Sequence, residues 1–316
     1  MEKPLKILAV VGPTASGKSA LAVKLAKALD GEIVSADSMQ IYTGMDIATA
    51  KPTPEEMRGI PHHMLDVADP EEDFSVARYV ELAAPCVDDI LARGKLPIVA
   101  GGTGLYLDSL LSGRTFAPFS PDGGLRARLE ARFDALGGGA MLGELAAADP
   151  EAAARLHPND RKRIVRALEV FQQTGKTISQ HNRETRALSP RYDALTLSLA
   201  FQRREDMWAR IDRRVDEMMA AGLAEEVRAL LDSGVPVRCT AMQAIGYKEM
   251  AAALRGGGDV CAAAEEIKLR SRQYAKRQLT WFRRTEGAKW LFWGPEPDFE
   301  AACRTSTKYL EEFGLV

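Results

Sequence analysis

The sequence from Leu5 to Ser19 reads LKILAVVGPTASGKS, and this stretch decides the fold. Its second half fits G-x-x-x-x-G-K-[ST], the pattern of a phosphate-binding loop, or P-loop. The apolar run before the loop is typical of a buried parallel strand. After the loop, Leu21, Leu25 and Leu29 recur every four residues, which predicts a helix over residues 16–29. A strand, a glycine-rich turn and a helix in this order form the context that the loop pattern requires.

The loop predicts a site for linked phosphates. Its backbone N–H groups and the N-terminus of the following helix converge on one point and attract an anion. Lys18 adds a mobile positive charge for the outer phosphates, and the Ser19 hydroxyl is a predicted ligand of Mg²⁺. The residues expected to hold phosphate are Gly12, Pro13, Thr14, Ala15, Ser16, Gly17, Lys18 and Ser19.

Further strands and helices alternate along the chain. We expect strands at Glu32–Ala36, Leu96–Ala100 and Leu195–Ala200, with a helix at Val76–Ala92 before the second of these. This alternation predicts an α/β fold, in which a P-loop NTPase-like parallel sheet is flanked by helices.

The middle of the chain has a different composition. Residues Phe116–Gly124 are rich in Pro, Ser and Gly, which suggests a boundary, and Leu125–Phe171 is expected to form helices broken at Gly137–Gly139. A chain of 316 residues is also long for one simple core. We therefore expect a catalytic core from residues 1–117 and 195–316, and a mostly helical insertion domain over residues 118–194.

Composition and charge narrow the class of protein. Hydrophobic residues make up 46% and charged residues 27%, which is typical of globular proteins, and the formal net charge of −2 argues against a generally basic protein. The four cysteines have no zinc-site spacing, so we expect ordinary thiols. Because Met1–Lys6 is charged and leads straight into a strand, we expect no signal peptide or membrane span and a cytoplasmic protein.

The usual ligand of a P-loop is ATP or GTP, and such nucleotidases carry an Asp at the end of another strand. Here the strand Leu96–Ala100 is followed by Gly101-Gly102-Thr103, without an acid. The guanine-recognition pattern Asn-Lys-x-Asp is also absent from the sequence. These features argue against a motor or a switch GTPase but leave a kinase open.

Asp37 follows the strand Glu32–Ala36 directly. Ligands of open α/β sheets bind at the carboxyl ends of the strands, so Asp37 and Thr103 should lie near the P-loop. A carboxylate there can hold Mg²⁺ through water or act as a general base. A turn or helix-capping role for Asp37 and a structural role for Thr103 are the alternatives.

Several further stretches together resemble the tRNA dimethylallyltransferase (tRNA isopentenylpyrophosphate transferase) family. They run in order along nearly the whole chain: the P-loop, Val34–Tyr42 with Asp-Ser-Met-Gln, Gly44–Pro52, Gly101–Tyr106, His157–Asp160, Arg163–Val170, Ile245–Lys248, and Lys276–Arg283 with Lys-Arg-Gln-x-Thr-Trp. Eukaryotic relatives often carry a Cys/His zinc module after the position of residue 300, and this sequence has none. It therefore resembles the compact bacterial form.

The resemblance implies transfer of a dimethylallyl group from dimethylallyl diphosphate to N6 of adenine 37, next to the anticodon of tRNA. The P-loop would then hold the diphosphate leaving group, with Mg²⁺ as cofactor. Asp37 would be the general base and Thr103 would lie beside the reacting centre. Arg210 and Arg214 are candidates for a further phosphate clamp, although a solvated basic helix face is the alternative.

The basic residues are unevenly distributed. Arg161, Lys162, Arg163 and Arg166 cluster in the expected insertion, and the Lys268–Arg284 segment interleaves basic residues with Tyr274 and Trp281, which could stack on bases. Solvated helix faces are the alternative. The resemblance implies RNA contacts at Asp37, Ser38, Met39, Gln40, Thr103, Arg126, Arg161, Lys162, Arg163, Ile164, Val165, Arg166, Gln243, Gly246, Tyr247, Lys248, Lys276, Arg277, Gln278, Thr280, Trp281 and Arg283.

We therefore expect a monomeric transferase that acts on the anticodon stem-loop of tRNA, with no membrane partner. Three other classes stay open on the residues alone. A small-molecule P-loop kinase and a prenyltransferase of free adenine nucleotides would not need the basic segments. An RNA-binding regulator would keep the P-loop only as a turn.

Overall fold

The computed structural model describes residues 5–113, 116, 123–186 and 189–315. The chain divides into two compact units. The core unit comprises Met1–Leu111 and Arg191–Val316, and the inserted unit comprises Ser112–Pro190. The boundary expected at Phe116–Gly124 lies largely outside the described residues. No helix in the described ranges is both long and apolar enough to cross a membrane.

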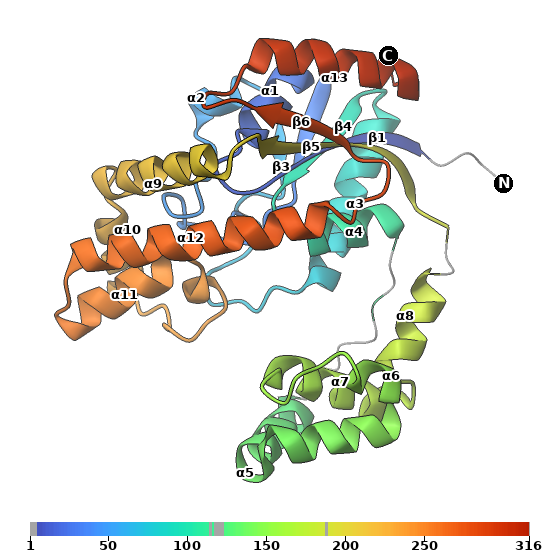
Figure 1. Cartoon of the computed structure of the whole chain (residues 1–316), viewed down its shortest axis with the longest axis vertical. Coiled ribbons are helices and arrows are strands. Elements are labelled where there is room, and N and C mark those ends of the chain that lie inside the picture. Colours follow the sequence, from blue (N-terminus) through green and yellow to red (C-terminus); the bar gives the residue numbers. More distant parts are fainter. Residues whose placement is uncertain (1–4, 114–115, 117–122, 187–188, 316) are drawn as a thin grey trace. The chain divides into compact units, whose positions relative to one another are not determined.

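The core unit is built on a six-stranded parallel sheet in the order β3-β2-β4-β1-β5-β6 (Figure 1). The strands are β1 (Leu5–Val11), β2 (Gly31–Ser35), β3 (His62–His63), β4 (Leu96–Gly101), β5 (Tyr192–Phe201) and β6 (Lys289–Trp293). In the register, Val10 lies between Ala100 of β4 and Leu197 of β5. The central strand β1 is apolar and buried from Ile7 to Val11 because helices cover both of its faces there.

The side chains of β1 alternate between two hydrophobic layers. Leu8 and Val10 pack in the layer that contains α1 (Lys18–Ala28) and α13 (Phe299–Phe313). Ile7, Ala9 and Val11 pack in the opposite layer, with α3 (Val76–Ala92) and α4 (Gly104–Ser112). Because all strands are parallel, their carboxyl ends lie at one edge of the sheet. The P-loop, Asp37 and Thr103 follow β1, β2 and β4 at this edge.

A helical layer continues from this edge. It contains α9 (Arg204–Ala220), α10 (Leu223–Asp232), the short 3-10 helix η1 (Ala241–Gln243), α11 (Tyr247–Gly256) and α12 (Val260–Phe282). Its core includes Ile41, Tyr42 and Met45 from the segment after β2. The short α2 (Pro54–Met57) ends that segment and begins with a capping box at Thr53. The chain after β2 is therefore anchored in the helical layer.

The inserted unit is helical. It consists of α5 (Gly123–Ala148), α6 (Pro150–Ala153), α7 (Arg161–Thr174) and α8 (Ile178–Arg186). The break expected at Gly137–Gly139 is confirmed at Gly137, whose angles are non-helical (φ 79°, ψ 160°), so two helical segments of α5 meet there at a kink. Leu129, Met141 and Leu145 of α5 pack on Ile164 and Leu168 of α7. This gives the unit a hydrophobic core of its own.

Candidate active site

The P-loop is held from three sides by side chains of other elements. The Thr14 amide donates to Oε1 of Gln278 (2.9 Å), Arg210 Nε donates to the Ala15 carbonyl (3.2 Å), and Trp293 Nε1 donates to the Ser16 carbonyl (2.8 Å). Gly17 has φ 80° at the start of α1, a left-handed conformation that glycine adopts without steric cost. The loop conformation is therefore fixed by α12, α9 and β6 as well as by its own sequence.

A cavity of about 710 Å³ opens above the loop. Lys18 and Ser19 of the loop line it together with Arg210 and Arg214 of α9, and Asp37 lies at its wall. Thr14, Ala15 and Gly17 also line the cavity, whereas Gly12, Pro13 and Ser16 are buried. The structure thus brings together the two arginines and the part of the loop for which we predicted phosphate contacts.

The two innermost cations are not neutralised by hydrogen-bonded carboxylates. Lys18 Nζ donates only a long bond (3.4 Å) to the Pro13 carbonyl, and within the described ranges no hydrogen bond or ion pair involves the Arg214 guanidinium. Desolvation lowers the pKa of Lys18 from 10.5 to about 8. The negative charge of Asp37 opposes this shift, and the positive charge of Arg214 adds to it. Desolvation also lowers the pKa of Arg214, again opposed by Asp37. Such a pair of cations favours a bound anion.

Asp37 uses one carboxylate oxygen in a turn. Oδ1 accepts from the Met39 amide (2.9 Å), so the turn role considered for this residue is present. The second oxygen, Oδ2, makes no hydrogen bond among those found in the described ranges. Thr103 lies close by, where its hydroxyl accepts from the Ser38 amide (3.0 Å) and donates to the Ser38 hydroxyl (3.2 Å). The strand ends therefore bring Asp37 and Thr103 to one place.

Asp37 also borders a second, smaller cavity of about 110 Å³. Apolar side chains of the helical layer form much of its wall, among them Ile211, Val215, Ile245 and Ile267. The two cavities share the residues Thr14, Ala15, Asp37, Thr49, Arg214 and Met218. A polar, cationic space and a mainly apolar space therefore meet at the Asp37 carboxylate.

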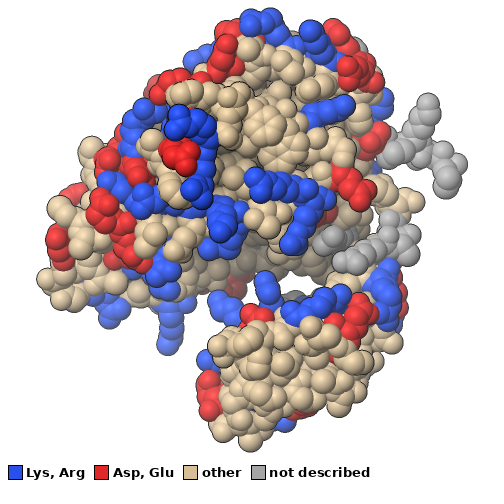
Figure 2. All heavy atoms as spheres, viewed as in Figure 1, with Lys and Arg blue, Asp and Glu red and all other residues tan. Residues whose placement is uncertain are grey.

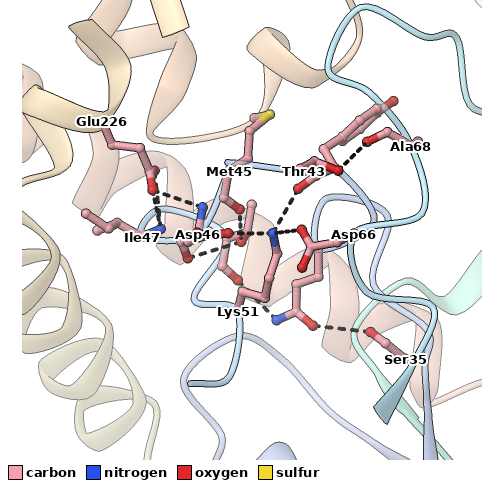
Figure 3. A network of polar contacts seen from close by, with 12 residues as sticks. Ser35, Thr43, Met45, Asp46, Ile47, Lys51, Asp66, Ala68 and Glu226 are labelled. Carbon is pink, nitrogen blue, oxygen red and sulfur yellow. Dashed lines mark hydrogen bonds and ion pairs between the residues drawn. The ribbon is translucent and has the colours of Figure 1, made fainter. Parts of the chain in front are cut away.

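The segment from Gln40 to Pro52 forms the wall next to both cavities, and a polar network holds it in place (Figure 3). The Lys51 ammonium donates to the Tyr42 carbonyl (2.8 Å) and pairs with Asp46 and Asp66 (2.5 Å each). The Gln40 amide donates to the carbonyls of Thr49 (3.2 Å) and Ala50 (3.0 Å) and accepts from Ser35 (3.2 Å). The contact with adenine expected for Gln40 would require breaking these bonds, so the structure favours a bracing role.

Glu226 of α10 closes the same network from the helical layer (Figure 3). Its carboxylate accepts from the amides of Asp46 (3.0 Å) and Ile47 (2.9 Å) and from the Tyr247 hydroxyl (2.5 Å). Tyr247 is fully buried and Gly246 packs closely against Ala48, so these two predicted RNA contacts serve packing here. Sequence reasoning missed Glu226, because an acid in an amphipathic helix carries no signal of its partners.

The predicted RNA-contact segment near the C-terminus lies on α12 and presents two faces. Lys276, Arg277, Thr280 and Trp281 line an exposed hollow of about 430 Å³ on the outer face. Lys and Arg side chains gather on the surface over α9 and α12 (Figure 2). Gln278 points to the other side and is only 6% exposed, so its side chain does not lie on the outer face with the other predicted RNA contacts of α12. Of the other predicted contacts in the core unit, Gln243, Lys248 and Arg283 are exposed, and Ser38 and Met39 are half-buried.

Tyr274 also belongs to the inner face of α12. Desolvation raises the pKa of its hydroxyl to about 12, with Asp37 as the next cause, and Thr103 and Gln278 lie within hydrogen-bonding reach. Tyr274, which we considered for stacking on bases, instead contacts the edge of the sheet where the carboxyl ends of the strands lie. Trp281, in contrast, remains 39% exposed.

In the inserted unit, the predicted RNA contacts separate by burial. Ile164 and Val165 are 0% and 2% exposed, so they form its core and do not face a ligand. The buried Glu169 carboxylate pairs with Arg126 (2.9 Å) and Arg166 (2.7 Å). Arg161 pairs with Asp134 (2.8 Å), and Lys162 and Arg163 are exposed.

The described residues contain no group of three or more His, Cys, Asp or Glu side chains that could hold a metal ion on their own. Ser19 and Asp37 nevertheless line the same cavity. One hydroxyl and one carboxylate are a donor set that fits Mg²⁺, which keeps most of its waters and takes further ligands from phosphates.

Comparison with known proteins places these features in a family. The IPP transferase family model matches residues 40–285, and the isopentenyl transferase model matches residues 5–72. The chain is 51% identical over 286 residues to tRNA dimethylallyltransferase 1 of Trichlorobacter lovleyi, covering 90% of this chain and 93% of that protein. It is 45% identical over 307 residues to the tRNA dimethylallyltransferase of a Thermoanaerobacter species, covering 97% and 98%.

Solved structures agree with this. The tRNA isopentenylpyrophosphate transferase of Bacillus halodurans is 40% identical, with a TM-score of 0.72 and coverage of 98% of both chains. A eukaryotic dimethylallyltransferase acting on tRNA is 29% identical, with a TM-score of 0.81 over 97% of this chain and 78% of that one.

Proposed function

The chain belongs to the tRNA dimethylallyltransferase family and is a transferase that modifies an adenine of tRNA; from this premise, we propose its donor, its target atom and the role of each site residue. The donor is dimethylallyl diphosphate, the acceptor is N6 of adenine 37 next to the anticodon, and the product leaving group is diphosphate. The observation that carries this proposal is the pair of desolvated cations without a hydrogen-bonded carboxylate, Lys18 and Arg214, in the cavity above the P-loop.

The larger cavity holds the diphosphate. Departure of diphosphate from the allylic carbon leaves negative charge on its oxygens, and the loop amides, Lys18, Arg210 and Arg214 stabilise that charge. Positive charge on the allylic carbon is delocalised by resonance, so the reaction needs little further help at carbon. Ser19 and Asp37 would hold Mg²⁺, which would supply additional charge neutralisation for the diphosphate.

Asp37 acts where the two cavities meet. The exocyclic amine of adenine is a weak nucleophile because its lone pair is delocalised into the ring. As the C–N bond forms, the amine becomes acidic, and the free Oδ2 of Asp37 takes its proton. Thr103, tied to Ser38 beside Asp37, lies next to the reacting centre. The base must be extruded from its stack to reach this point.

The anticodon stem-loop binds along the outer face of α12 and on the inserted unit. The exposed residues Lys276, Arg277, Thr280 and Trp281 supply phosphate contacts and one stacking surface on α12. On the inserted unit, Lys162 and Arg163 are the exposed cations of the predicted set. We propose that the protein works as a monomer in the cytoplasm, where its tRNA substrate is found.

One experiment tests this function against its alternatives. The protein is incubated with labelled dimethylallyl diphosphate, Mg²⁺, and either an anticodon stem-loop or AMP. Label should appear on the stem-loop and be lost with Asp37→Ala, which removes the base. Label on AMP alone would indicate an adenylate prenyltransferase. Absence of transfer, or ADP formation from ATP with a metabolite acceptor, would contradict the proposal.

A further inference from the structure

Gln278 connects two parts of the core unit that are distant in sequence. Its Oε1 accepts from the Thr14 amide of the P-loop (2.9 Å), and its Nε2 donates to the Gly102 carbonyl after β4 (2.9 Å). The side chain is 6% exposed, and both of its polar atoms are therefore satisfied by the backbone. One amide thus bridges the phosphate cradle and the turn that carries Thr103.

The α12 side chains approach the Gly102–Gly104 turn so closely that they restrict which residues this turn can contain. A Cβ at Gly102 would lie 2.3 Å from Gln278 Nε2, and a Cβ at Gly104 would lie 2.3 Å from the Trp281 ring. Trp281 also donates from Nε1 to Asp108 of α4 (3.0 Å). Through buried Gln278 and through Trp281, which borders the outer hollow, α12 is therefore in direct contact with the Gly102–Gly104 turn.

The hydrogen bond to Thr14 has a consequence for the ligand. A P-loop binds phosphate through backbone amides that point to one spot, so the loop must hold each amide in that orientation. Gln278 takes the Thr14 N–H out of that set and fixes the start of the loop, so the amides after it are oriented before the ligand arrives. Preorganised donors of this kind need no rearrangement as charge develops.

We propose that Gln278 is a positioning residue for the diphosphate cradle, reaching the P-loop from the helix whose outer face binds RNA. This inference rests on the proposed function for the identity of the anion. Gln278 borders the larger cavity, but its Oε1 and Nε2 are engaged by Thr14 and Gly102, and it acts through these two residues. Substitution of Gln278 therefore weakens binding of the diphosphate and leaves RNA affinity unchanged.

The chain offers a matched control on the same helix. Gln273 is also a glutamine of α12, but it is exposed and lines the outer hollow with Lys276 and Arg277. Gln278→Met keeps the length of the side chain and removes both hydrogen bonds, so it disturbs packing less than Gln278→Ala. Gln273→Met makes the same chemical change on the outer face.

The experiment measures two affinities for each variant. Inorganic pyrophosphate, with Mg²⁺, is titrated by calorimetry, and an anticodon stem-loop is titrated separately by fluorescence anisotropy. For Gln278→Met we expect an approximately tenfold weaker pyrophosphate affinity, because losing the hydrogen bond that holds the Thr14 amide costs about 1.4 kcal/mol of loop order that binding must then supply, and a stem-loop affinity within about twofold of wild type. For Gln273→Met we expect unchanged pyrophosphate affinity.

Steady-state kinetics separate positioning from a general loss of structure. A merely structural defect lowers the folded fraction and hence kcat, whereas misplacement of the cradle raises KM for dimethylallyl diphosphate. The inference is overturned if Gln278→Met weakens stem-loop binding, or if its pyrophosphate affinity and donor KM equal those of wild type. A wild-type protein that binds pyrophosphate but transfers no dimethylallyl group would refute the proposed function and leave the role of Gln278 in the cradle standing.

Discussion

The Lys18 side chain should lower the free energy of unfolding of the protein, although it helps to bind the ligand. Its ammonium is desolvated in the cavity wall and lies near the Arg214 guanidinium, so the folded state disfavours the charged form. Replacing Lys18 by Met keeps the shape of the side chain and removes the charge. We therefore expect Lys18→Met to bind diphosphate poorly and yet to be more stable than wild type.

The size of this effect follows from the pKa of Lys18. The folded-state pKa of about 8 lies below the ordinary value of 10.5, so at pH 7 the charged form is penalised on folding. At 1.36 kcal/mol for each pKa unit the full difference gives about 3 kcal/mol, and since the side chain is not fully buried we take about 2 kcal/mol. For a unit of this size that corresponds to a melting temperature about 5 °C higher.

The pH dependence has a definite sign. Between pH 8 and pH 10.5 the unfolded chain holds the Lys18 proton and the folded chain has released it. Stability of the wild type therefore rises with pH in this window. The advantage of Lys18→Met should be complete below pH 8 and should disappear by about pH 10.5.

Thermal unfolding followed by circular dichroism, from pH 7 to pH 10.5, measures the effect. Lys24→Met is the matched control, because Lys24 lies on the same helix and makes an exposed ion pair with Glu300 (2.6 Å). Its removal should change stability by no more than about 1 kcal/mol. A Lys18→Met protein that melts at or below the wild-type temperature at pH 7 would refute the reasoning.

Three further predictions concern the base, the wall of the cavities and the sheet. Asp37→Asn should lower kcat at least about 100-fold, since a general base contributes a rate factor of that size, while stem-loop affinity stays within about twofold. Near-normal turnover of the variant in a quench assay would show that Asp37 is not the general base. Glu226→Gln should cost about 1–2 kcal/mol in urea unfolding and raise the donor KM, because an amide whose oxygen accepts from the Asp46 and Ile47 N–H groups presents an NH2 where the Tyr247 hydroxyl donates, whereas Glu225→Gln should be neutral. Arg93 lowers the pKa of the buried Glu32 to about 2, so Glu32→Gln should be about 2 kcal/mol less stable at pH 7. That difference should narrow as pH falls from 4.5 towards 2, and a constant difference in melting temperature would contradict it.

The sequence predicts the parts of the site that depend on local rules. The P-loop pattern, the helix after it and the strand before Asp37 are all set by neighbouring residues, and the edge rule for parallel sheets then brings Asp37 and Thr103 together. The two-residue strand His62–His63 has no such signal, because it exists only through its pairing with Ile33 and Val34 of β2. The strand Lys289–Trp293 was not predicted either, and its place follows from pairing with β5.

Burial separates the predicted RNA contacts into inward-facing and outward-facing residues. Tyr247 and Gln278 lie within segments shared with the family, and a motif does not say which face of a helix each residue occupies. Helical spacing carries part of that information, since Tyr274 and Gln278 are four residues apart and so share a face of α12. The partners of that face, Thr14 and Gly102, come from the distant end of the chain and cannot be inferred from spacing.

The central claim is that diphosphate departs as carbon moves to the adenine amine. It is tested most directly by measuring released diphosphate and incorporated label together, with an anticodon stem-loop and with the same stem-loop carrying purine, which lacks the exocyclic amine, in place of the target adenine. We predict equal amounts of diphosphate and incorporated label with adenine, and neither with purine. Label incorporation into the purine-substituted RNA, or transfer without release of diphosphate, would contradict the account.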